Sequence, residues 1–432
     1  MHRYSALLCC FCLLAACSGS APATPSTLDD AAPVEEDTAS EPSDAEDETL
    51  SDTTVADTGT KPDTKPGMVD TSPPDTGPPG LKSVIAIGAG YNHTCAALAD
   101  GTVRCTGIND FGQLGDGKTF KVFVPVKALV TSVVSIAGGA NHTCVRLTGN
   151  TVSCFGANDR GQLGDGTTMN RLAATPVVGL TNVTQIAAGR YHTCALINDG
   201  TVKCWGYSFQ GQVGDGTTMT RTTPVAVSGL SGVTQISLGS SHSCALLSDK
   251  TVKCWGDGMM LGTPSTDAKT PILLPGVTDV RALSAGQTHT CVVVGAPPAN
   301  KVMCFGSNAF GQLGDDTLDF RTTPVQATGI SDVVDLASGS VFTCARLTSG
   351  SAKCWGSAQL GAMGDGTFTP VRGAKGSAVP LSNILELEAG GGQVCARLAD
   401  TAIWCWGDNL NGYLGDGTSI SRALPVAMRA TP

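Results

Sequence analysis

The sequence predicts an all-β protein, a seven-bladed β-propeller of four-stranded blades, closed by the C-terminal strand and preceded by a disordered tether. A unit of about 50 residues recurs seven times after Gly80. Within each unit, short runs of β-prone residues alternate with Gly, Asn and Asp, and no stretch has a convincing helical period. One four-stranded sheet cannot bury both faces alone, so the sheets must pack against one another. Seven such sheets lie within the usual range for a closed ring.

Residues 1–16 are predicted to be an export signal. The apolar run Tyr4–Ala16 follows Arg3 and is too short to span a bilayer as a stable helix. Leu14–Cys17 resembles the bacterial lipoprotein signal, in which cleavage precedes a cysteine that becomes lipidated. The resemblance implies that Cys17 carries acyl chains and anchors the protein in the bacterial cell envelope. Ser18 favours the outer membrane, and an ordinary signal peptide remains the alternative.

Residues 17–80 are predicted to form an acidic, disordered tether. From Ser18 to Gly80 there are 15 acidic residues, only Lys61 and Lys65 as basic ones, and no aromatic residue. Such a segment cannot bury enough apolar surface to offset its chain entropy. The formal net charge of the whole chain is -10, and the part after Gly80 is nearly neutral. This charge pattern argues against nucleic acid as a partner.

Residues 81–432 are predicted to form the propeller. In the fourth unit, strands are expected at Pro224–Ser228, Val233–Leu238, His242–Leu247 and Thr251–Gly256. A strand that begins Pro-Val, Pro-Ile or Pro-Leu opens each later unit, but none precedes the first unit, and the last copy lies near the end of the chain. We therefore expect Leu424–Met428 to pair into the first blade and close the ring.

The cysteines after residue 80 are predicted to form one disulfide in each blade. In the third unit the turn Asn198–Gly200 places Cys194 opposite Cys204 across a hairpin, at a separation that a disulfide can bridge. Export supplies the oxidising compartment. Metal binding is the weaker interpretation, because no Cys-x-x-Cys spacing occurs. The expected pairs are Cys95–Cys105, Cys144–Cys154, Cys194–Cys204, Cys244–Cys254, Cys291–Cys304, Cys344–Cys354 and Cys395–Cys405.

Three motifs of the unit resemble a known repeat family. They read Gly-x-x-His-Thr-Cys-Ala-Leu, Asp-Gly-Thr-Val-Lys-Cys-Trp-Gly and Gly-Gln-Leu-Gly-Asp-Gly, as in Gly189–Leu196, Asp199–Gly206 and Gly211–Gly216. These motifs resemble the regulator of chromosome condensation repeat, and the resemblance spans about Leu81 to Ala430. It implies a seven-bladed propeller, and cysteines paired within each blade are typical of exported members.

The resemblance implies two kinds of activity. A nuclear relative is a guanine-nucleotide exchange factor for a small GTPase; it docks on chromatin and uses a wedge inserted in one blade. The units of this chain keep a near-constant length. An exported relative is a bacterial inhibitor of β-lactamase that grips its target with blade-tip loops. The inhibitor is the closer precedent in compartment and architecture, and exchange-factor activity is kept as an alternative.

Residues that recur in most units are assigned to structure. Histidines occupy one position in five units, replaced by Phe342 and Gln393 in the others, and hydrogen bonding to neighbouring backbone is favoured over a metal-binding ring. The recurring tryptophans are expected to pack between sheets. The Asp of each Gly-Asp-Gly turn, with an Arg six residues later in four units, favours a local ion pair over a calcium site. No unique catalytic constellation stands out, so no catalytic residue, cofactor or metal is expected.

Departures from the repeat carry the functional information. The fourth unit replaces its loop with Asp257–Pro264, which places Met259 and Met260 near one rim, and the fifth lengthens a hairpin at Gly295–Asn300. The candidate interface residues on the Met259 side are Met259, Met260, Phe111, Phe209, Phe310 and Tyr413. Packing beneath the loops is the alternative role for these side chains.

Together these features predict a lipid-anchored, monomeric, non-enzymatic scaffold that binds another envelope or extracellular protein. The second hypothesis is a glycan-binding or sialidase-like propeller, because Asp-Gly-Thr before Trp loosely resembles an Asp-box. The third is the exchange-factor activity of the nuclear relative. Paired non-repeating carboxylates at the channel mouth would favour a glycosidase, and a broad apolar rim patch would favour protein recognition.

Overall fold

A computed structural model of the chain describes residues 69–70, 80–264 and 266–430. The predicted export signal, the predicted lipidation site Cys17 and nearly all of the predicted tether lie outside these residues. Val69–Asp70 forms the short strand β1, which runs parallel to the last strand of the chain. Within the part of the chain that the structure describes, no helix is both long and apolar enough to cross a bilayer.

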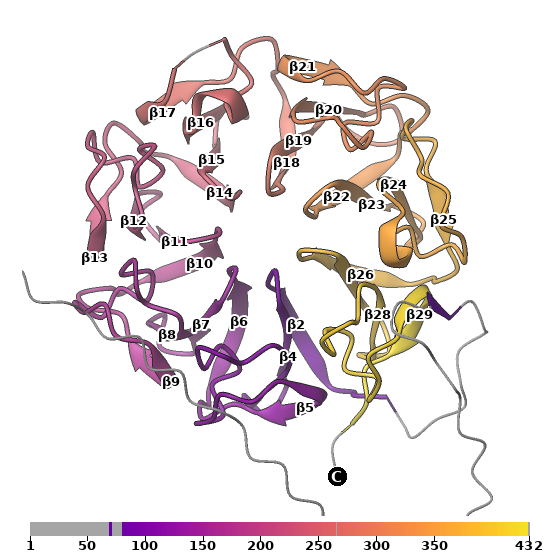
Figure 1. Cartoon of the computed structure of the whole chain (residues 1–432). Helices are drawn as coiled ribbons and strands as arrows, with labels where there is room; N and C mark the ends of the chain where they lie inside the picture. The colour runs from indigo at the N-terminus through magenta and orange to yellow at the C-terminus, as the bar shows by residue number, and fades with distance from the viewer. Residues whose placement is uncertain (1–68, 71–79, 265, 431–432) are drawn as a thin grey trace, which may run out of the picture. The chain divides into compact units, whose positions relative to one another are not determined.

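Seven antiparallel sheets surround a central axis and form the predicted seven-bladed propeller (Figure 1). Each blade contains four consecutive strands, with the first at the centre and the fourth at the periphery. Blades 1 to 4 are formed by β2 (Val84–Ala89), β3 (His93–Leu98), β4 (Val103–Gly107) and β5 (Val122–Lys127); β6 (Val133–Gly138), β7 (His142–Leu147), β8 (Val152–Gly156) and β9 (Arg171–Pro176); β10 (Val183–Ala188), β11 (His192–Ile197), β12 (Val202–Gly206) and β13 (Arg221–Ala226); β14 (Val233–Leu238), β15 (His242–Leu247), β16 (Val252–Gly256) and β17 (Ala268–Leu273).

Blades 5 to 7 repeat this arrangement. They are formed by β18 (Val280–Ala285), β19 (His289–Val294), β20 (Lys301–Gly306) and β21 (Arg321–Gln326); β22 (Val333–Ser338), β23 (Phe342–Leu347), β24 (Ala352–Gly356) and β25 (Ser377–Val379); β26 (Ile384–Ala389), β27 (Gln393–Leu398), β28 (Ile403–Gly407) and β29 (Ser421–Ala427). Two short 3₁₀ helices, η1 (Gly258–Met260) and η2 (Gln359–Gly361), lie in the loops of blades 4 and 6.

The second and third strands of each blade are buried on both faces, because neighbouring blades cover them. In β11 the first five side chains are all buried. The hairpin after β11 turns at Gly200, whose φ of 78° is the left-handed conformation that the sequence predicts there. Cys194 consequently lies opposite Cys204. The predicted disulfide is present in all seven blades, with Cα atoms 4.0–4.1 Å apart.

The predicted pairing of Leu424–Met428 with the first blade is wrong. The last strand, β29, pairs with β28 of the seventh blade, and Val426 lies opposite Cys405. The Pro-Val strand is thus the fourth strand of the blade that precedes it, as β13 is in the third blade. The physical reason is that the loop after the third strand folds back and returns the chain antiparallel to that strand.

The ring closes between the seventh and first blades by the same contacts that join other blades. The N–H of Val84 donates to the carbonyl of Thr401 in the hairpin of the seventh blade, just as Val133 donates to Gly101. The chain end adds to this joint, because the N–H of Leu81 donates to the carbonyl of Met428. In Figure 1 the yellow seventh blade accordingly lies beside the indigo first blade. Side-by-side packing closes the ring without exchange of a strand.

The strand directions define two rims of the propeller. The turns between first and second strands and the loops between third and fourth strands lie at one end, which we call the loop rim. The hairpins between second and third strands and the connections between blades lie at the other end, which we call the hairpin rim. The lengthened hairpin at Gly295–Asn300 is on the hairpin rim, where the Asn300 side chain accepts a hydrogen bond from the N–H of Val333 in the next blade.

Candidate functional site

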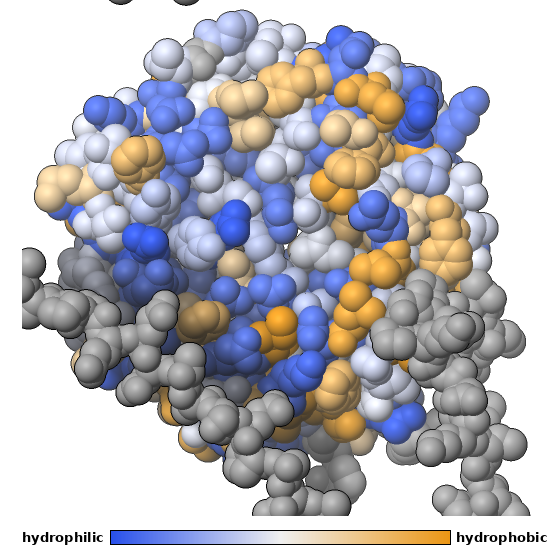
Figure 2. Space-filling model, in the orientation of Figure 1, coloured by the Kyte–Doolittle hydropathy of each residue, from blue (hydrophilic) through white to orange (hydrophobic). Residues whose placement is uncertain are grey.

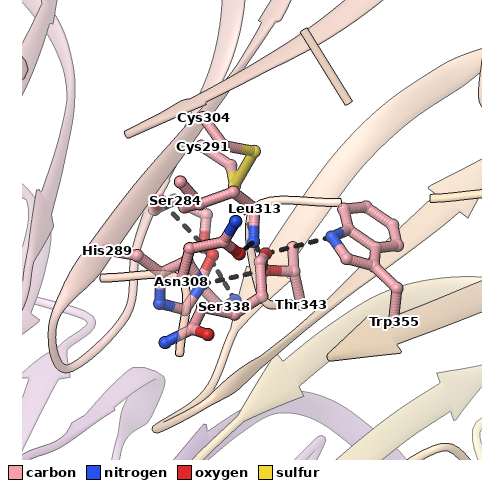
Figure 3. The surroundings of a disulfide bond; sticks show 10 residues. Ser284, His289, Cys291, Cys304, Asn308, Leu313, Ser338, Thr343 and Trp355 are labelled. Atoms are coloured by element: carbon pink, nitrogen blue, oxygen red, sulfur yellow. Dashed lines mark hydrogen bonds between the residues drawn. A yellow bond between two sulfur atoms is a disulfide. The ribbon is translucent and has the colours of Figure 1, made fainter. Parts of the chain in front are cut away.

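The recurring histidines form joints between neighbouring blades. Each is fully buried, and its Nε2 lies 2.7–2.9 Å from a hydroxyl of the next blade. Figure 3 shows one of these joints, in which His289 of the fifth blade meets Thr343 of the sixth beside the disulfide Cys291–Cys304. The histidines are hydrogen-bonded, but the predicted backbone partner is wrong, because Nε2 meets a side-chain hydroxyl of the next blade. The five pairs are His93–Thr143, His142–Thr193, His192–Ser243, His242–Thr290 and His289–Thr343.

The hydrogen bonds fix the proton on Nε2 in four of these joints. The hydroxyl of Thr193, for example, donates its one proton to the carbonyl of Gln162 at 2.9 Å, so it must accept from His142. Nδ1 of the imidazole has no partner and faces the glycine three residues earlier, where any Cβ would collide with the ring. Burial lowers the pKa of His142 to about 4 and that of His192 to about 3. These imidazoles are neutral structural groups.

Two blade joints depart from this pattern. In the joint between blades 6 and 7, Phe342 replaces the histidine and Val394 replaces the hydroxyl residue, and both are buried in one apolar cluster. In the joint between blades 7 and 1, the side-chain amide of Gln393 donates to the carbonyl of Gly90 at 2.9 Å. Each substitution therefore keeps the two blades in contact by different chemistry.

The recurring tryptophans pack between blades, as predicted. Their indole N–H groups donate to a backbone carbonyl in the loop of the preceding blade, as Trp355 does to Gln312 (Figure 3). The same carbonyl accepts the hydroxyl of Thr343. The buried tryptophans are Trp205, Trp255, Trp355 and Trp406, and Phe155 and Phe305 replace them in two blades.

Buried polar side chains hold the loops of the loop rim in one conformation. In the second blade, Asn158 accepts the N–H of Leu163 and donates to Asp165, which is paired with Arg171 at 2.7 Å. Burial alone would raise the pKa of Asp165, but hydrogen bonds from Thr167 and Arg171 hold it below its ordinary value. The carboxylate is thus engaged inside the loop, as the prediction of a local ion pair requires. Among residues 80–264 and 266–430, no group of three or more His, Cys, Asp or Glu side chains is placed to hold a metal ion.

The loop rim carries most of the exposed apolar side chains. The described residues include seventeen large exposed hydrophobic side chains, and eleven of them lie in the loops between third and fourth strands. The most exposed are Phe120 at 74% and Phe209 at 72%. On the face shown in Figure 2, hydrophobic patches alternate with hydrophilic ones around the central opening. The eleven residues are Phe111, Phe120, Met169, Phe209, Met219, Met259, Phe310, Leu318, Phe320, Phe368 and Leu410.

The predicted interface residues divide into two groups. Phe111, Phe209, Met259 and Phe310 are exposed on the loop rim, and Met260 is partly buried beside Met259. Tyr413 differs from the expectation: its side chain is only 4% exposed, and its hydroxyl accepts a hydrogen bond from Asn411. It occupies the position where four other blades have glutamine, and it packs beneath the loop.

Sequence reasoning missed three carboxylates on the first strands of blades 6 and 7. Two of them, Asp335 and Glu388, line the central channel, a cavity of about 270 Å³ lined by the first strand of every blade. Glu386 is paired with Arg397 at 2.7 Å, and Asp335 lies 3.8 Å from Arg346. Burial, together with the charges of Glu386 and Asp335, raises the pKa of Glu388 well above its ordinary value. The sequence did carry a signal for these carboxylates, because the other blades have Ala, Gly, Ser or Gln at the same positions of the repeat.

Tyr91 crosses the mouth of the channel at the loop rim. Its hydroxyl lies 2.9 Å from that of Ser240, three blades away. Burial raises the pKa of Tyr91 to about 12. The channel carboxylates Asp335 and Glu388 are therefore shielded on this side, and Asp335 is held in an ion pair with Arg346.

These features define a class of protein, the closed seven-bladed propellers whose repeated loops present one structured rim. Residues 131–431 match the model of the RCC1-like domain, and residues 84–113 and 100–146 match models of the regulator of chromosome condensation (RCC1) repeat. The chain belongs to the regulator of chromosome condensation repeat family.

Solved structures share the fold. Yeast RCC1 (Prp20), in its complex with Kap60, has a TM-score of 0.64 at 19% identity over 88% of this chain and 92% of that chain. Prp20p from Saccharomyces cerevisiae, in a structure whose description concerns its binding to Gsp1p and histones, has a TM-score of 0.64 at 21% identity over 81% and 88%. Human WBSCR16 has a TM-score of 0.63 at 22% identity over 72% and 86%.

A curated sequence relative matches over a shorter stretch. The E3 ubiquitin-protein ligase HERC2 of Homo sapiens is 27% identical over 132 residues, which is 30% of this chain. The matched stretch spans only 3% of the length of that ligase.

Proposed function

We propose that this protein is a lipid-anchored, extracytoplasmic scaffold whose loop rim binds another envelope or extracellular protein without catalysis. The carrying observation is the concentration of exposed Phe, Met and Leu side chains on loops that buried Asn and Asp side chains, paired with partly exposed Arg, hold in place. Exposed apolar patches on a soluble domain mark recognition sites, and a rigid rim lowers the entropy lost on binding.

The disulfide in every blade indicates an oxidising compartment. An exchange factor for a cytosolic GTPase would not meet its substrate there. A glycosidase needs two carboxyl groups that reach the sugar. In this propeller Glu386 and Asp335 are paired with Arg397 and Arg346, and Tyr91 crosses the channel at the loop rim. Protein recognition through the loop rim is the function that these contacts support.

Whole-cell crosslinking followed by mass spectrometry tests the rim. We expect the variant Phe209→Ser/Met259→Ser to lose the partner that the unmodified protein captures, because both side chains are more than half exposed. Removing one buried interface anchor typically costs about 2 kcal/mol, so the combined loss should exceed tenfold. The matched control is Leu129→Ser/Val178→Ser, two exposed apolar residues outside the loop rim. An unchanged set of crosslinked proteins in the rim variant would remove the basis of the proposal.

The membrane anchor is tested separately through Cys17. We expect wild-type protein to incorporate labelled palmitate and to sediment with the outer membrane, and Cys17→Ser to incorporate none. Several acyl chains hold a protein on a bilayer durably, whereas a tether without them gives no hydrophobic hold. Absence of labelled palmitate from the wild-type protein would contradict lipidation at Cys17 and favour the alternative, an ordinary signal peptide.

A further inference from the structure

A second cavity of about 450 Å³ opens at the mouth of the channel on the loop rim. Most of its lining residues belong to blades 6 and 7, and Tyr91 lines both this cavity and the channel. Ligand sites usually have volumes of about 300–1,000 Å³, so the size is sufficient for an amino-acid side chain with part of its backbone. Val341, Phe342 and Leu360 give the cavity an apolar wall.

Several departures from the repeat meet at this cavity. Ala362 stands where four other blades have glutamine, and Phe342 stands where five have histidine. The turn of the seventh blade is Gly391-Gly392, whereas every other blade has at least one larger side chain at these two positions. Leu360 adopts a left-handed φ of 55°, which is unusual for a residue other than glycine. Small residues thus open the space, and the repeat alone explains none of them.

The wall formed by the seventh blade presents a carboxylate. A Cβ at Gly392 would lie 2.9 Å from the Cβ of Asp408, so the glycine leaves room for the aspartate beside it. Asp408 accepts the N–H of Leu410 at 3.0 Å, and no lysine or arginine of the described propeller forms an ion pair with it. Burial raises the pKa of this carboxyl, and hydrogen bonds from Leu410, Ser421 and Asn409 only partly oppose the rise. It is a partly desolvated acid that lacks a cation.

We propose that this cavity is an anchor pocket for one basic side chain, arginine or lysine, of the protein partner. The aliphatic stem would lie against Val341, Phe342 and Leu360, and the cationic end would reach Asp408. Basic side chains combine an apolar stem with a charged head in this way. The proposal rests on the proposed function, because it assigns the pocket to a partner at the loop rim.

Arg190 stands on another part of the same cavity wall, with its guanidinium 5.0 Å from the ring of Tyr191. An acidic side chain seated against Arg190 is therefore the competing occupant. The peptides acetyl-Gly-Arg-Gly-amide and acetyl-Gly-Glu-Gly-amide distinguish the two when their binding to the purified full chain is followed by ligand-observed NMR.

We expect the arginine peptide to bind in the millimolar range, and Asp408→Asn to weaken it about tenfold, because a charge-assisted hydrogen bond is lost. Ala362→Gln, which restores the residue of four other blades, should fill the pocket and abolish binding. The matched control is Asp257→Asn, which alters the carboxylate at the equivalent position of the fourth blade, outside the cavity. Unchanged melting temperatures exclude loss of folding as the cause.

Three results would overturn the pocket: no binding of the arginine peptide, equal binding by Asp408→Asn, or preferential binding of the glutamate peptide. The proposed function fails differently, through unchanged crosslinks in the rim variant. If Phe209→Ser/Met259→Ser loses the partner while Asp408→Asn binds the arginine peptide normally, the proposal of recognition through the loop rim is supported and the proposal of an anchor pocket is rejected.

Discussion

Acidification from pH 7 to pH 5 is expected to destabilise the propeller by several kcal/mol, because five buried histidines cannot accept protons. Their side chains have no exposed surface, Nε2 of each is engaged with a hydroxyl of the next blade, and Nδ1 has no hydrogen-bond partner that would stabilise a second proton. Burial lowers the pKa of each, to about 3 or 4, and for His93 the neighbouring charge of His142 adds to the effect.

The sign follows from proton linkage. An unfolded histidine titrates near its ordinary pKa of about 6.5. Below that pH the histidines of the unfolded chain bind protons, while the buried histidines of the folded chain stay unprotonated. The stability that each buried histidine contributes is fully present above about pH 6.5. It is lost as the pH falls toward the pKa of that histidine in the folded state. At pH 5 each histidine accounts for about 2 kcal/mol. Five such groups sum to at most about 10 kcal/mol, which is comparable to the whole stability of a typical domain.

Carboxyl groups with shifted pKa values also change how the free energy of unfolding depends on pH. The raised pKa values of Glu388, Asp335 and Asp408 oppose the loss, because the native state takes up these protons first as the pH falls. The lowered pKa values of Asp165, Asp215 and Asp315 reinforce it only near and below the ordinary pKa of aspartate. The histidines therefore dominate between pH 6.5 and pH 4.5.

Urea unfolding at a series of pH values measures the effect. The free energy of unfolding should fall near pH 5 with a slope that corresponds to roughly four protons per molecule, after the offset from Glu388. His192→Gln, which copies the residue that Gln393 provides, should reduce that slope by about one proton. A slope below one proton in the unmodified protein would show that the buried imidazoles are protonated in the folded state.

The number and content of the blades could be predicted from sequence because the fold repeats. The cysteine spacing, together with the Asn198–Gly200 turn, places Cys194 opposite Cys204, and that local geometry needs no knowledge of the rest of the chain. The phase of the blades could not be predicted in this way. A repeat has the same period wherever the unit is cut, so the Pro-Val strand could equally end one blade or begin the next.

The candidate site was only partly predictable for a related reason. Exposed rim residues such as Phe209 follow from the position of their loop after the third strand. The channel mouth, in contrast, is assembled from turns that are far apart in sequence, and only the closed ring brings Tyr91 to Ser240. Departures from the repeat, such as Phe342, were visible in the sequence, but their shared location depends on knowing which blades adjoin.

The joint between blades 6 and 7 shows how such a departure is compensated. Phe342 has the position of a joint histidine, and the backbone of Gly339 lies over its ring as Gly286 lies over His289. Val394 has the position of the hydroxyl partner, and the two side chains pack in one buried cluster. An apolar pair has therefore replaced a hydrogen-bonded pair. A change at only one of the two positions would place an apolar side chain against a polar one.

Phe342→His is expected to destabilise the protein by about 4 kcal/mol, because it shrinks a buried ring and leaves an imidazole N–H facing a methyl group. Val394→Thr should cost about 1 kcal/mol, since the new hydroxyl can donate to the Ala362 carbonyl that already accepts Trp406. In the double variant the imidazole regains a hydroxyl acceptor, as in the joint of His289 with Thr343. The double variant should therefore be about 2 kcal/mol more stable than additivity predicts.

Urea unfolding of the four proteins at pH 7.5 closes this double-mutant cycle. The matched cycle at the neighbouring joint, His289→Phe with Thr343→Val, should show coupling of the same sign, because it converts a polar joint to the apolar kind. If the changes in the free energy of unfolding were additive in both cycles, the two side chains of a joint would have no interaction free energy. The blades would then be held together by their apolar cores and loop contacts alone, and the histidine positions would be interchangeable with any side chain that fills the space.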